Sequence, residues 1–214
     1  MSDTQRQVDL VVRTIAQTAI DNETYFGDLD SVVGDGDFGY SLARGFEKII
    51  EGWDDIDRTN PGTFLKKVGM IVSSRIGGTS GPIWGTGFMK AGITAGTADS
   101  LTGDDVVAML RAATDGIKMR GQSDVGDKTL LDALVPMTER IDAELKAGTD
   151  PAGVLAAAAV TARQAAEATS EMIAKRGRAS YTGERSRGSV DAGAMAVAVL
   201  VEHINQAWPT EGES

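Results

Sequence analysis

Hydrophobic residues recur at helical spacing along most of the chain, with polar residues between them. Val8, Val12, Ile15 and Ala19 illustrate the pattern, because residues three or four positions apart lie on one face of an α-helix. No stretch alternates polar and apolar residues in the way that is typical of a half-buried strand, so we predict an all-α protein. About eight helices are expected. One begins near residue 80, and the others contain or cover about residues 8–19, 42–50, 61–74, 102–121, 129–145, 151–176 and 193–207.

End signals mark several of these helices. Pro82 and Pro151 suit first turns, where the missing N–H group costs no hydrogen bond. Thr102 and Asp150 are typical N-caps, and Asp104 lies where the positive end of the helix dipole favours a carboxylate. Because these signals coincide with the hydrophobic stripes, they support the predicted helix starts.

One long connection interrupts the predicted helices, at "RGRASYTGERSRGSVDAG", residues 176–193. Loops of this length without regular structure are usually functional or disordered. This loop lies between two strongly patterned helices and carries Arg176, Arg178, Arg185 and Arg187, whose guanidinium groups suit bidentate contacts with phosphate. We therefore expect a functional loop, the alternative being a solvated charged loop.

Composition and charge exclude several classes of function. The 214 residues carry a formal net charge of −10, which disfavours nucleic acid and anionic membrane surfaces as partners. The sequence has no cysteine, so disulfides, thiolate metal sites and a cysteine nucleophile are excluded. The first stretch, "MSDTQRQVDL", has no apolar signal core, and the longest strongly apolar run, "VLAAAAV", is too short to span a bilayer. A cytoplasmic location is therefore expected.

The stretch "LDSVVGDGDFGYSLARGF" holds Asp30, Asp35 and Asp37 close together, with no Lys or Arg between them. Hard divalent cations such as Mg²⁺ prefer carboxylate oxygens, and the intervening glycines permit the tight turns that let carboxylates converge. An EF-hand counted from Asp35 fails, because Gly39 and Phe46 stand where oxygen ligands are required. A metal site is one interpretation, and a solvated acidic loop that caps the following helix is the other.

Two further stretches, "GGTSGP" and "GQSDVGDKTLLDAL", place glycines at expected helix starts. Backbone N–H groups at a helix start can bind phosphate, and glycine lets the backbone approach it closely. In the second stretch, Asp127 is a candidate helix cap and Lys128 a candidate partner for phosphate or carboxylate. Taken alone, each stretch also reads as an ordinary capping turn. Combined with the aspartates and the arginine loop, they are the parts of a site for a magnesium–polyphosphate complex.

Four motifs, "GDGDFG", "GGTSGP", "GDKTLLDAL" and "GRASYTGERSRGSVDAGA", appear in the order in which they occur in the nucleotide-binding L subunit of dihydroxyacetone kinases, the DhaL family. The chain resembles this family over nearly its whole length. The resemblance implies a barrel or bundle of about eight antiparallel helices that forms one nucleotide-binding domain over residues 1–214. It also implies a kinase, a phosphotransferase with an alcohol group as acceptor, that binds ADP or ATP and two Mg²⁺ ions.

The resemblance assigns site residues by matched position. In the family, three aspartates hold the two Mg²⁺ ions that bridge the nucleotide phosphates, and here they are Asp30, Asp35 and Asp37. The family usually has His at the position of Phe38 and Pro at the position of Ala192. No catalytic residue is assigned. The matched nucleotide contacts are Phe38, Gly39, Tyr40, Ser41, Thr79, Ser80, Gly121, Leu130, Arg178, Asp191, Ala192 and Gly193.

In that family, the acceptor ketose is held covalently on a histidine of a separate K subunit. This chain has one histidine, His203, in its last predicted helix, so the resemblance implies half of an enzyme that phosphorylates dihydroxyacetone, erythrulose or another small ketose. The implied phosphoryl donor is ATP or a phosphotransferase-system protein that recharges a bound nucleotide, and the expected assembly is a homodimer or hetero-oligomer. Two alternatives stay open: a nucleotide-binding regulatory module without catalysis, and a stand-alone magnesium-dependent phosphatase.

Overall fold

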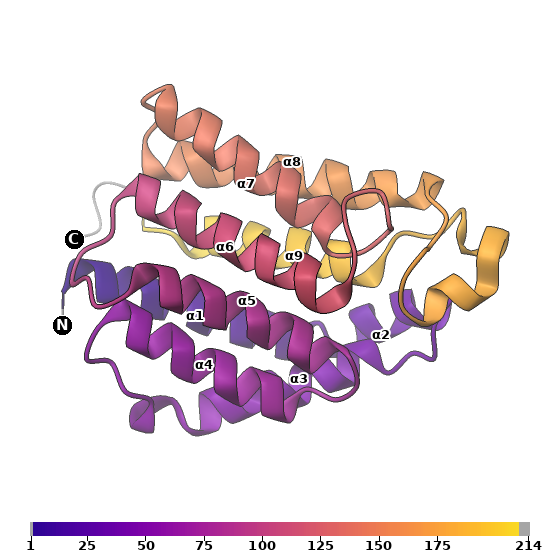
Figure 1. Ribbon diagram of the computed structural model, residues 1–214, viewed down its shortest axis with the longest axis horizontal. Coiled ribbons are helices and arrows are strands. Elements are labelled where there is room, and N and C mark those ends of the chain that lie inside the picture. Colours follow the sequence, from indigo (N-terminus) through magenta and orange to yellow (C-terminus); the bar gives the residue numbers. More distant parts are fainter. Residues whose placement is uncertain (1, 210–214) are drawn as a thin grey trace.

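The computed structural model describes residues 2–209, and nine α-helices account for most of them (Figure 1). Three 3-10 segments join some of the α-helices, and no β-strand occurs within residues 2–209. The α-helices are α1 (Asp3–Asp21), α2 (Glu23–Ser31), α3 (Phe38–Glu51), α4 (Pro61–Arg75), α5 (Ser80–Ala95), α6 (Gly103–Gly121), α7 (Leu131–Lys146), α8 (Pro151–Ala168) and α9 (Ala192–Ala207). The 3-10 segments are η1 (Trp53–Asp55), η2 (Thr169–Glu171) and η3 (Arg178–Ser186).

Eight of the α-helices close into a barrel. Around it, α1 packs beside α3, α3 beside α4, and each later helix beside the next, until α9 returns to α1. Neighbours along this order run antiparallel, so the starts of α3, α5, α7 and α9 lie at one end of the barrel, on the right in Figure 1. The predicted all-α barrel of eight antiparallel helices is therefore confirmed.

The short helix α2 is an addition to the predicted eight. Asn22 separates it from α1: the Asn22 backbone N–H donates to the Thr18 carbonyl at 3.1 Å, and the side-chain amide donates to the same carbonyl at 2.9 Å. Of its nine residues, α2 buries Phe26, so it lacks the repeated apolar stripe from which a helix is predicted. It packs on α3 and α9 at the end of the barrel where α3 starts (Figure 1).

Alanine and aliphatic side chains make up most of the barrel core, together with the fully buried rings of Phe26, Phe46 and Phe64. Helix α9 packs against α1, α7 and α8 and buries nine residues, more than any other helix in the described range. Where helices approach closely, glycine stands in place of larger residues: a Cβ on Gly69 of α4 would lie 2.9 Å from the backbone oxygen of Gly85 in α5. The abundant alanine and glycine thus permit close helix packing.

Within residues 2–209, no helix is both long and apolar enough to cross a bilayer.

The predicted end of α8 is wrong. The hydrophobic pattern predicts a helix to residue 176, but α8 ends at Ala168 and η2 follows. Thr169 begins this tighter turn, where its hydroxyl donates to the Ala166 carbonyl at 2.5 Å and accepts the Asp191 N–H at 2.8 Å. The connection predicted to lack regular structure contains η3, which consists of two 3-10 pieces that meet at Gly183, where φ is 57°.

Candidate functional site

Three aspartate side chains converge at the end of the barrel where α3 begins. Asp30 lies in the last turn of α2, Asp35 in the connection to α3, and Asp37 at the N-cap position of α3. One carboxylate oxygen from each lies within 4.8 Å of the other two. The Asp37 side chain makes no capping hydrogen bond to the first turn of α3, so this carboxylate does not act as the helix cap. We call these three residues the aspartate cluster.

Glycines make this convergence possible. The Gly34 N–H donates to the Asp30 carbonyl at 2.6 Å, and a Cβ on Gly34 would overlap the Asp30 carboxylate. Gly36 has a φ of 76°, in the left-handed region that glycine adopts without steric cost. The resulting tight turn between α2 and α3 brings Asp35 and Asp37 back toward Asp30.

The aspartate cluster suits a hard divalent cation. It offers three anionic oxygen ligands, and the side chains of Asp35 and Asp37 are 42% and 57% exposed, which leaves room for further ligands. Arg178 of η3 reaches the same place: its guanidinium forms an ion pair with Asp35, and its Nη1 lies 3.8 Å from Asp37 Oδ2. The fold thus brings the arginine of the long connection to the carboxylates near the start of the chain.

The first residues of α3 carry predicted nucleotide contacts with different surroundings. Gly39 is buried, and a Cβ there would collide with the backbone oxygen of Glu23 in α2. The ring of Phe38 packs against that of Phe26, with the centroids 6.2 Å apart. Tyr40 is 58% exposed. The Phe38 ring therefore packs against α2, and the absence of a side chain at Gly39 lets α2 approach α3 closely. Tyr40 faces solvent.

The "GGTSGP" segment adjoins the start of α3. A Cβ on Gly77 would lie 3.3 Å from the hydroxyl oxygen of Ser41. Thr79 is the N-cap residue of α5, although its side chain makes no capping hydrogen bond, and Ser80 is the first residue of that helix. Gly121 ends α6, and a Cβ on it would lie 3.1 Å from a side chain in the first turn of α5. These predicted contacts therefore share one side of the barrel end.

A second group of predicted contacts lies where α7 and α9 begin. Leu130 is the N-cap residue of α7, and Ala192 and Gly193 are the first two residues of α9. A Cβ on Gly193 would lie 3.3 Å from the Cβ of Leu130. Asp191 caps α9, because its carboxylate accepts the Ala194 N–H at 2.7 Å. Both groups of contacts lie at the barrel end that carries the aspartate cluster (Figure 1).

The capping role predicted for Asp127 is wrong. Its carboxylate accepts the N–H of Asp124 at 3.1 Å, within the turn that precedes α7. Asp132, in the first turn of α7, organises this turn instead: its carboxylate accepts the Gly126 N–H at 2.5 Å and the Thr129 N–H at 2.7 Å. A carboxylate two residues inside the helix can fold back in this way, and the sequence pattern for an N-cap does not reveal it.

The role predicted for Lys128, as a partner of phosphate or carboxylate, is wrong. It is 2% exposed, and its ammonium group donates to the carbonyls of Met172, Ser186 and Ser189 in the long connection. The prediction identified a lysine at a glycine-rich helix start, but the acceptors are backbone groups far along the chain, and the sequence does not mark such groups.

Asp191 has an unusual electrostatic environment. Part of the residue stays in contact with solvent, yet the protein around its carboxylate raises the pKa to about 7, mainly through burial. The hydrogen bond from the Ala194 N–H lowers this pKa, nearby Asp132 raises it, and Lys128 lowers it. Burial is therefore the dominant cause, and the folded protein holds a proton on Asp191 more tightly than the unfolded chain does.

We expect Asp191→Asn to flatten the pH dependence of stability between about pH 4 and pH 7. A carboxyl with a raised folded-state pKa stabilises the fold below its unfolded pKa, and this contribution is lost as the pH rises through the folded pKa. The free energy of unfolding of the wild type, relative to Asp191→Asn, should therefore fall by up to about 4 kcal/mol across this window. Urea denaturation at several pH values measures it.

Asp150→Asn is the matched control for that measurement. Asp150 caps α8 by accepting the Gly153 N–H at 3.1 Å, as Asp191 caps α9, but Asp150 is exposed to solvent. Its replacement removes a capping carboxylate that is not buried, so it should not reproduce the effect of Asp191→Asn. The same change of profile in both variants would contradict a raised pKa at Asp191.

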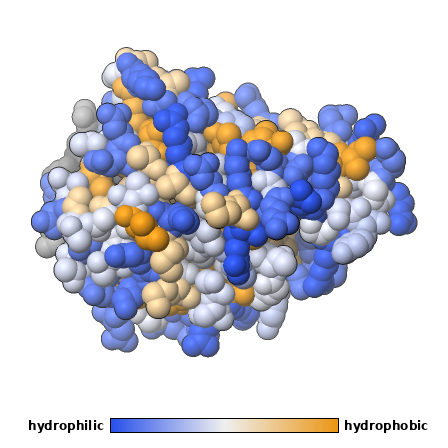
Figure 2. Space-filling model, in the orientation of Figure 1, coloured by the Kyte–Doolittle hydropathy of each residue, from blue (hydrophilic) through white to orange (hydrophobic). Residues whose placement is uncertain are grey.

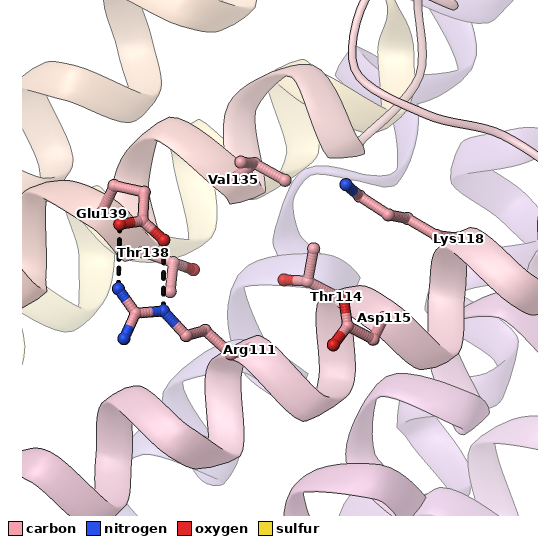
Figure 3. Close-up of a pocket in the computed structure, with 7 residues that line it drawn as sticks. All are labelled: Arg111, Thr114, Asp115, Lys118, Val135, Thr138 and Glu139. Atoms are coloured by element: carbon pink, nitrogen blue, oxygen red, sulfur yellow. Dashed lines mark hydrogen bonds and ion pairs between the residues drawn. The ribbon is translucent and has the colours of Figure 1, made fainter.

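A polar pocket of about 200 Å³ lies between α6 and α7 (Figure 3). Its arginine and lysine already have partners: Arg111 lies 2.9 Å from Glu139 and from Asp142, and Lys118 lies 2.7 Å from Asp124. Neither the aspartate cluster nor any predicted nucleotide contact lines this pocket, so we do not assign the candidate site to it. Its lining residues are Arg111, Thr114, Asp115, Lys118, Val135, Thr138 and Glu139.

Comparison with known proteins identifies relatives for most of the chain. Residues 32–206 match the family model of the DAK2 domain. The chain is 38% identical over 178 residues to the ADP-binding subunit DhaL of the PEP-dependent dihydroxyacetone kinase of Escherichia coli (strain K12), covering 83% of this chain and 85% of that protein. It is 36% identical over 204 residues to an L-erythrulose 1-kinase of Mycolicibacterium smegmatis, covering 94% of this chain and 35% of that protein.

The fold has a counterpart among solved structures. The dihydroxyacetone kinase of C. freundii, crystallised in complex with AMP-PNP and Mg²⁺, superposes with a TM-score of 0.75 at 26% sequence identity, covering 94% of this chain and 34% of that chain. This chain therefore corresponds to one part of each of the two longer kinases. Asp35, Asp37 and all the predicted nucleotide contacts fall within the matched residues 32–206. By these matches, the chain belongs to the DAK2 domain family, as a member of the DhaL type found in dihydroxyacetone kinases.

Proposed function

We propose that this chain is the nucleotide-binding subunit of a dihydroxyacetone-kinase-type enzyme and that it binds ADP or ATP with Mg²⁺ at the aspartate end of the barrel. The observation that carries the proposal is the aspartate cluster, whose carboxylate oxygens lie within 4.8 Å of one another. The relatives support it, because the Escherichia coli protein is named an ADP-binding subunit and the C. freundii structure contains AMP-PNP and Mg²⁺.

The residues of the cluster fit the metal. Asp30, Asp35 and Asp37 would hold the two ions that the family resemblance implies, since Mg²⁺ takes a few carboxylates and leaves its other positions to phosphate oxygens and water. When bound, the metal neutralises phosphate charge and orients the terminal phosphoryl group. Such neutralisation matters at the aspartate cluster, because three carboxylates without a metal repel a polyphosphate.

Other residues at the barrel end are proposed to hold the nucleotide. The starts of α3 and α5, with Ser41, Thr79 and Ser80, offer backbone N–H and hydroxyl groups for phosphate oxygens. Arg178 lies against the cluster, where its planar guanidinium is suited to grip two phosphate oxygens at once. Gly193 and Leu130 lie close together, since a Cβ on Gly193 would be 3.3 Å from the Cβ of Leu130, and both are proposed to contact the nucleotide.

The acceptor is proposed to be a small ketose, such as dihydroxyacetone or erythrulose, held on a separate K subunit. His203 is the one histidine of the chain, and its Nδ1 lies 2.9 Å from the Val199 carbonyl within α9, away from the aspartate cluster. Val32, Tyr40 and Tyr181, at the barrel end, are 64%, 58% and 89% exposed. These apolar and aromatic side chains are suited to the docking of a partner protein.

Two phosphoryl donors fit this arrangement. Relatives from Escherichia coli and Lactococcus lactis are named PEP-dependent and PTS-dependent, respectively. If the donor is a phosphoprotein of a phosphotransferase system, it would phosphorylate an ADP that stays bound to this chain. A kinase that uses ATP directly would instead release ADP in each turnover. Detection of free ADP during turnover therefore distinguishes the two donors for this chain.

The proposed nucleotide site predicts a strict dependence on the metal. In EDTA, calorimetric titration of the metal-stripped protein with ADP should give little heat, because the aspartate cluster repels the phosphates. Mg²⁺ should raise the affinity for ADP by at least about tenfold. Adenosine is the control, because it lacks phosphates and its binding should not respond to Mg²⁺. An equal affinity for ADP with and without Mg²⁺ would rule out binding through the metal.

A further inference from the structure

Lys128 places a buried ammonium group beneath the segment that carries Arg178. The residue is 2% exposed, and its φ of 62° lies in the left-handed region that residues other than glycine seldom occupy. A buried cation is costly unless its N–H donors all find acceptors. The combination of burial, charge and an uncommon backbone conformation indicates a specific role for this side chain.

Three backbone carbonyls serve as the acceptors. The Lys128 ammonium donates to the Met172 carbonyl at 3.2 Å, to the Ser189 carbonyl at 2.7 Å, and to the Ser186 carbonyl in a short hydrogen bond. An ammonium group has three N–H donors, so each is used. Met172 and Ser189 bound a segment, residues 172–189, that we call the arginine excursion. One side chain therefore ties both ends of this excursion together.

The far part of the arginine excursion has little packing of its own. The side chain of Arg178 is 58% exposed and Tyr181 is 89% exposed. Nearer the base, Ser186 is fully buried: its hydroxyl accepts the Ala174 N–H at 2.9 Å and donates to the Gly183 carbonyl at 2.6 Å. Segments with few buried contacts open at low free-energy cost. The position of Arg178 therefore depends on how firmly the base is held.

Lys128 is itself firmly attached to the barrel. Asp132 of α7 accepts the N–H groups of Gly126 and Thr129, which flank Lys128 in the turn before this helix. The Lys175 N–H of the excursion also donates to the Asp127 carbonyl, next to Lys128, at 3.1 Å. A continuous set of hydrogen bonds thus runs from α7 through Lys128 to the base of the excursion.

We infer that Lys128 is a positioning residue: by holding both ends of the arginine excursion, it sets Arg178 against the aspartate cluster. The inference rests on the proposed function for the importance of Arg178 to nucleotide binding. A lysine suits the task, because three N–H bonds that diverge from one nitrogen can meet three carbonyls, whereas the donors of a guanidinium lie in one plane.

A double-mutant cycle tests this role. Affinity for Mg-ADP is measured by calorimetry for the wild type, Lys128→Met, Arg178→Ala and the double variant. Arg178→Ala should weaken binding by about tenfold in the wild type, but by less than about twofold in the Lys128→Met background, where Arg178 is already misplaced. An equal loss in both backgrounds would show that Lys128 does not act through Arg178. Absence of any effect of Arg178→Ala in the wild type would likewise overturn the inference.

Hydrogen exchange gives a second measurement that does not depend on the nucleotide. In Lys128→Met, the amides of residues 172–189 should exchange at least about tenfold faster, while those of α4 and α5 keep their wild-type rates. Unchanged exchange in the excursion would overturn the inference. If the wild type itself fails to bind Mg-ADP, the proposed function fails, and hydrogen exchange still decides whether Lys128 holds the excursion.

Two further variants complete the design. Lys146→Met is the control, because Lys146 is an exposed lysine that pairs with Asp142 at 2.7 Å and forms no hydrogen bond or ion pair with residues 172–189. It should leave both measurements unchanged. If Lys128→Met does not fold, Lys128→Gln replaces it in both experiments, since its amide keeps two N–H donors. Lys128→Gln should then show smaller changes of the same kind in Mg-ADP affinity and in hydrogen exchange. Wild-type behaviour of this variant would contradict the inference.

Discussion

Asp35→Ala and Asp37→Ala are each expected to abolish magnesium-dependent nucleotide binding while the helical barrel stays intact. Each substitution removes a carboxylate from a cluster whose oxygens lie within 4.8 Å of one another. Loss of groups that only orient a metal ligand typically costs about 10–100-fold in affinity, so loss of a ligand should cost at least about a hundredfold. Both side chains lie at the surface of the barrel end, so no core packing is lost.

The same substitutions should not destabilise the metal-free protein. Removal of one of three neighbouring carboxylates relieves repulsion between like charges. The ion pairs with Arg178 are lost as well, but more than half of the Arg178 side chain is exposed, and exposed ion pairs contribute little. Thermal melts in EDTA should therefore show a melting temperature equal to that of the wild type or higher.

Melts with Mg-ADP complete the measurement. A ligand that binds the folded state raises the melting temperature of the wild type, and this rise should vanish in Asp35→Ala and Asp37→Ala. Asp28→Ala is the control, because Asp28 is an exposed aspartate of α2 outside the aspartate cluster, and it should keep the full rise. A full rise in Asp35→Ala or Asp37→Ala would show that the aspartate concerned is not a ligand.

The isolated chain is expected to phosphorylate no sugar, and activity should appear only when a ketose-binding subunit is added. The residues assigned to the site account for metal and polyphosphate. Phosphoryl transfer also requires the acceptor hydroxyl to lie in line with the terminal phosphate, held by polar groups and usually near a base. His203 cannot supply these groups at the site, because α9 begins at the site and His203 lies toward its other end, as the twelfth of its 16 residues.

A coupled assay of ADP release measures this dependence. The purified chain is supplied with ATP, Mg²⁺ and either dihydroxyacetone, erythrulose or tetritols, with and without a K subunit of a dihydroxyacetone kinase. Positioning of the acceptor alone can raise the reaction rate by many orders of magnitude, so the K subunit should raise turnover at least about 1000-fold. If a phosphoprotein is the donor, the same difference should appear as sugar phosphate formed without free ADP.

The control in this assay is Asp35→Ala, which should stay inactive with the K subunit present. Turnover of a sugar by the isolated chain, abolished by Asp35→Ala, would identify a complete kinase and contradict the two-subunit proposal. Release of phosphate from ADP by the isolated chain would instead favour a magnesium-dependent phosphatase. Binding of Mg-ADP without turnover under all of these conditions would favour a regulatory module.

Helix periodicity made the barrel predictable from the sequence, because it reflects local geometry. A stripe such as that of α1 needs a residue only every three or four positions, and caps such as Thr102 and Asp150 act within one turn. The structure confirms both caps. Helix α2 was not predicted, because Phe26 is its buried residue and it has no repeated hydrophobic stripe. The end of α8 was not predicted, because the Thr169 hydroxyl accepts the N–H of Asp191, a residue 22 positions later in the chain.

The aspartate cluster was predictable for the same reason. Its three members lie within eight positions, and the glycines between them mark a tight turn, so their convergence is a short-range property of the chain. The structure places the other matched positions at the same barrel end, because antiparallel helices return alternate helix starts to one side. Their individual contacts with the nucleotide stay a prediction.

Local sequence patterns therefore predicted most of the helices and the convergence of the aspartates, whereas the contacts of Lys128, Asp132 and Arg178 depend on the tertiary fold. In the sequence, Lys128 is a charged residue two positions after Gly126, and a phosphate partner is as consistent with it as a backbone carbonyl. Its acceptors lie 44 to 61 positions away, and Arg178 meets Asp35 across most of the chain. Such pairings depend on which barrel surfaces meet, and no local pattern of hydrophobic and polar residues encodes the choice of acceptor.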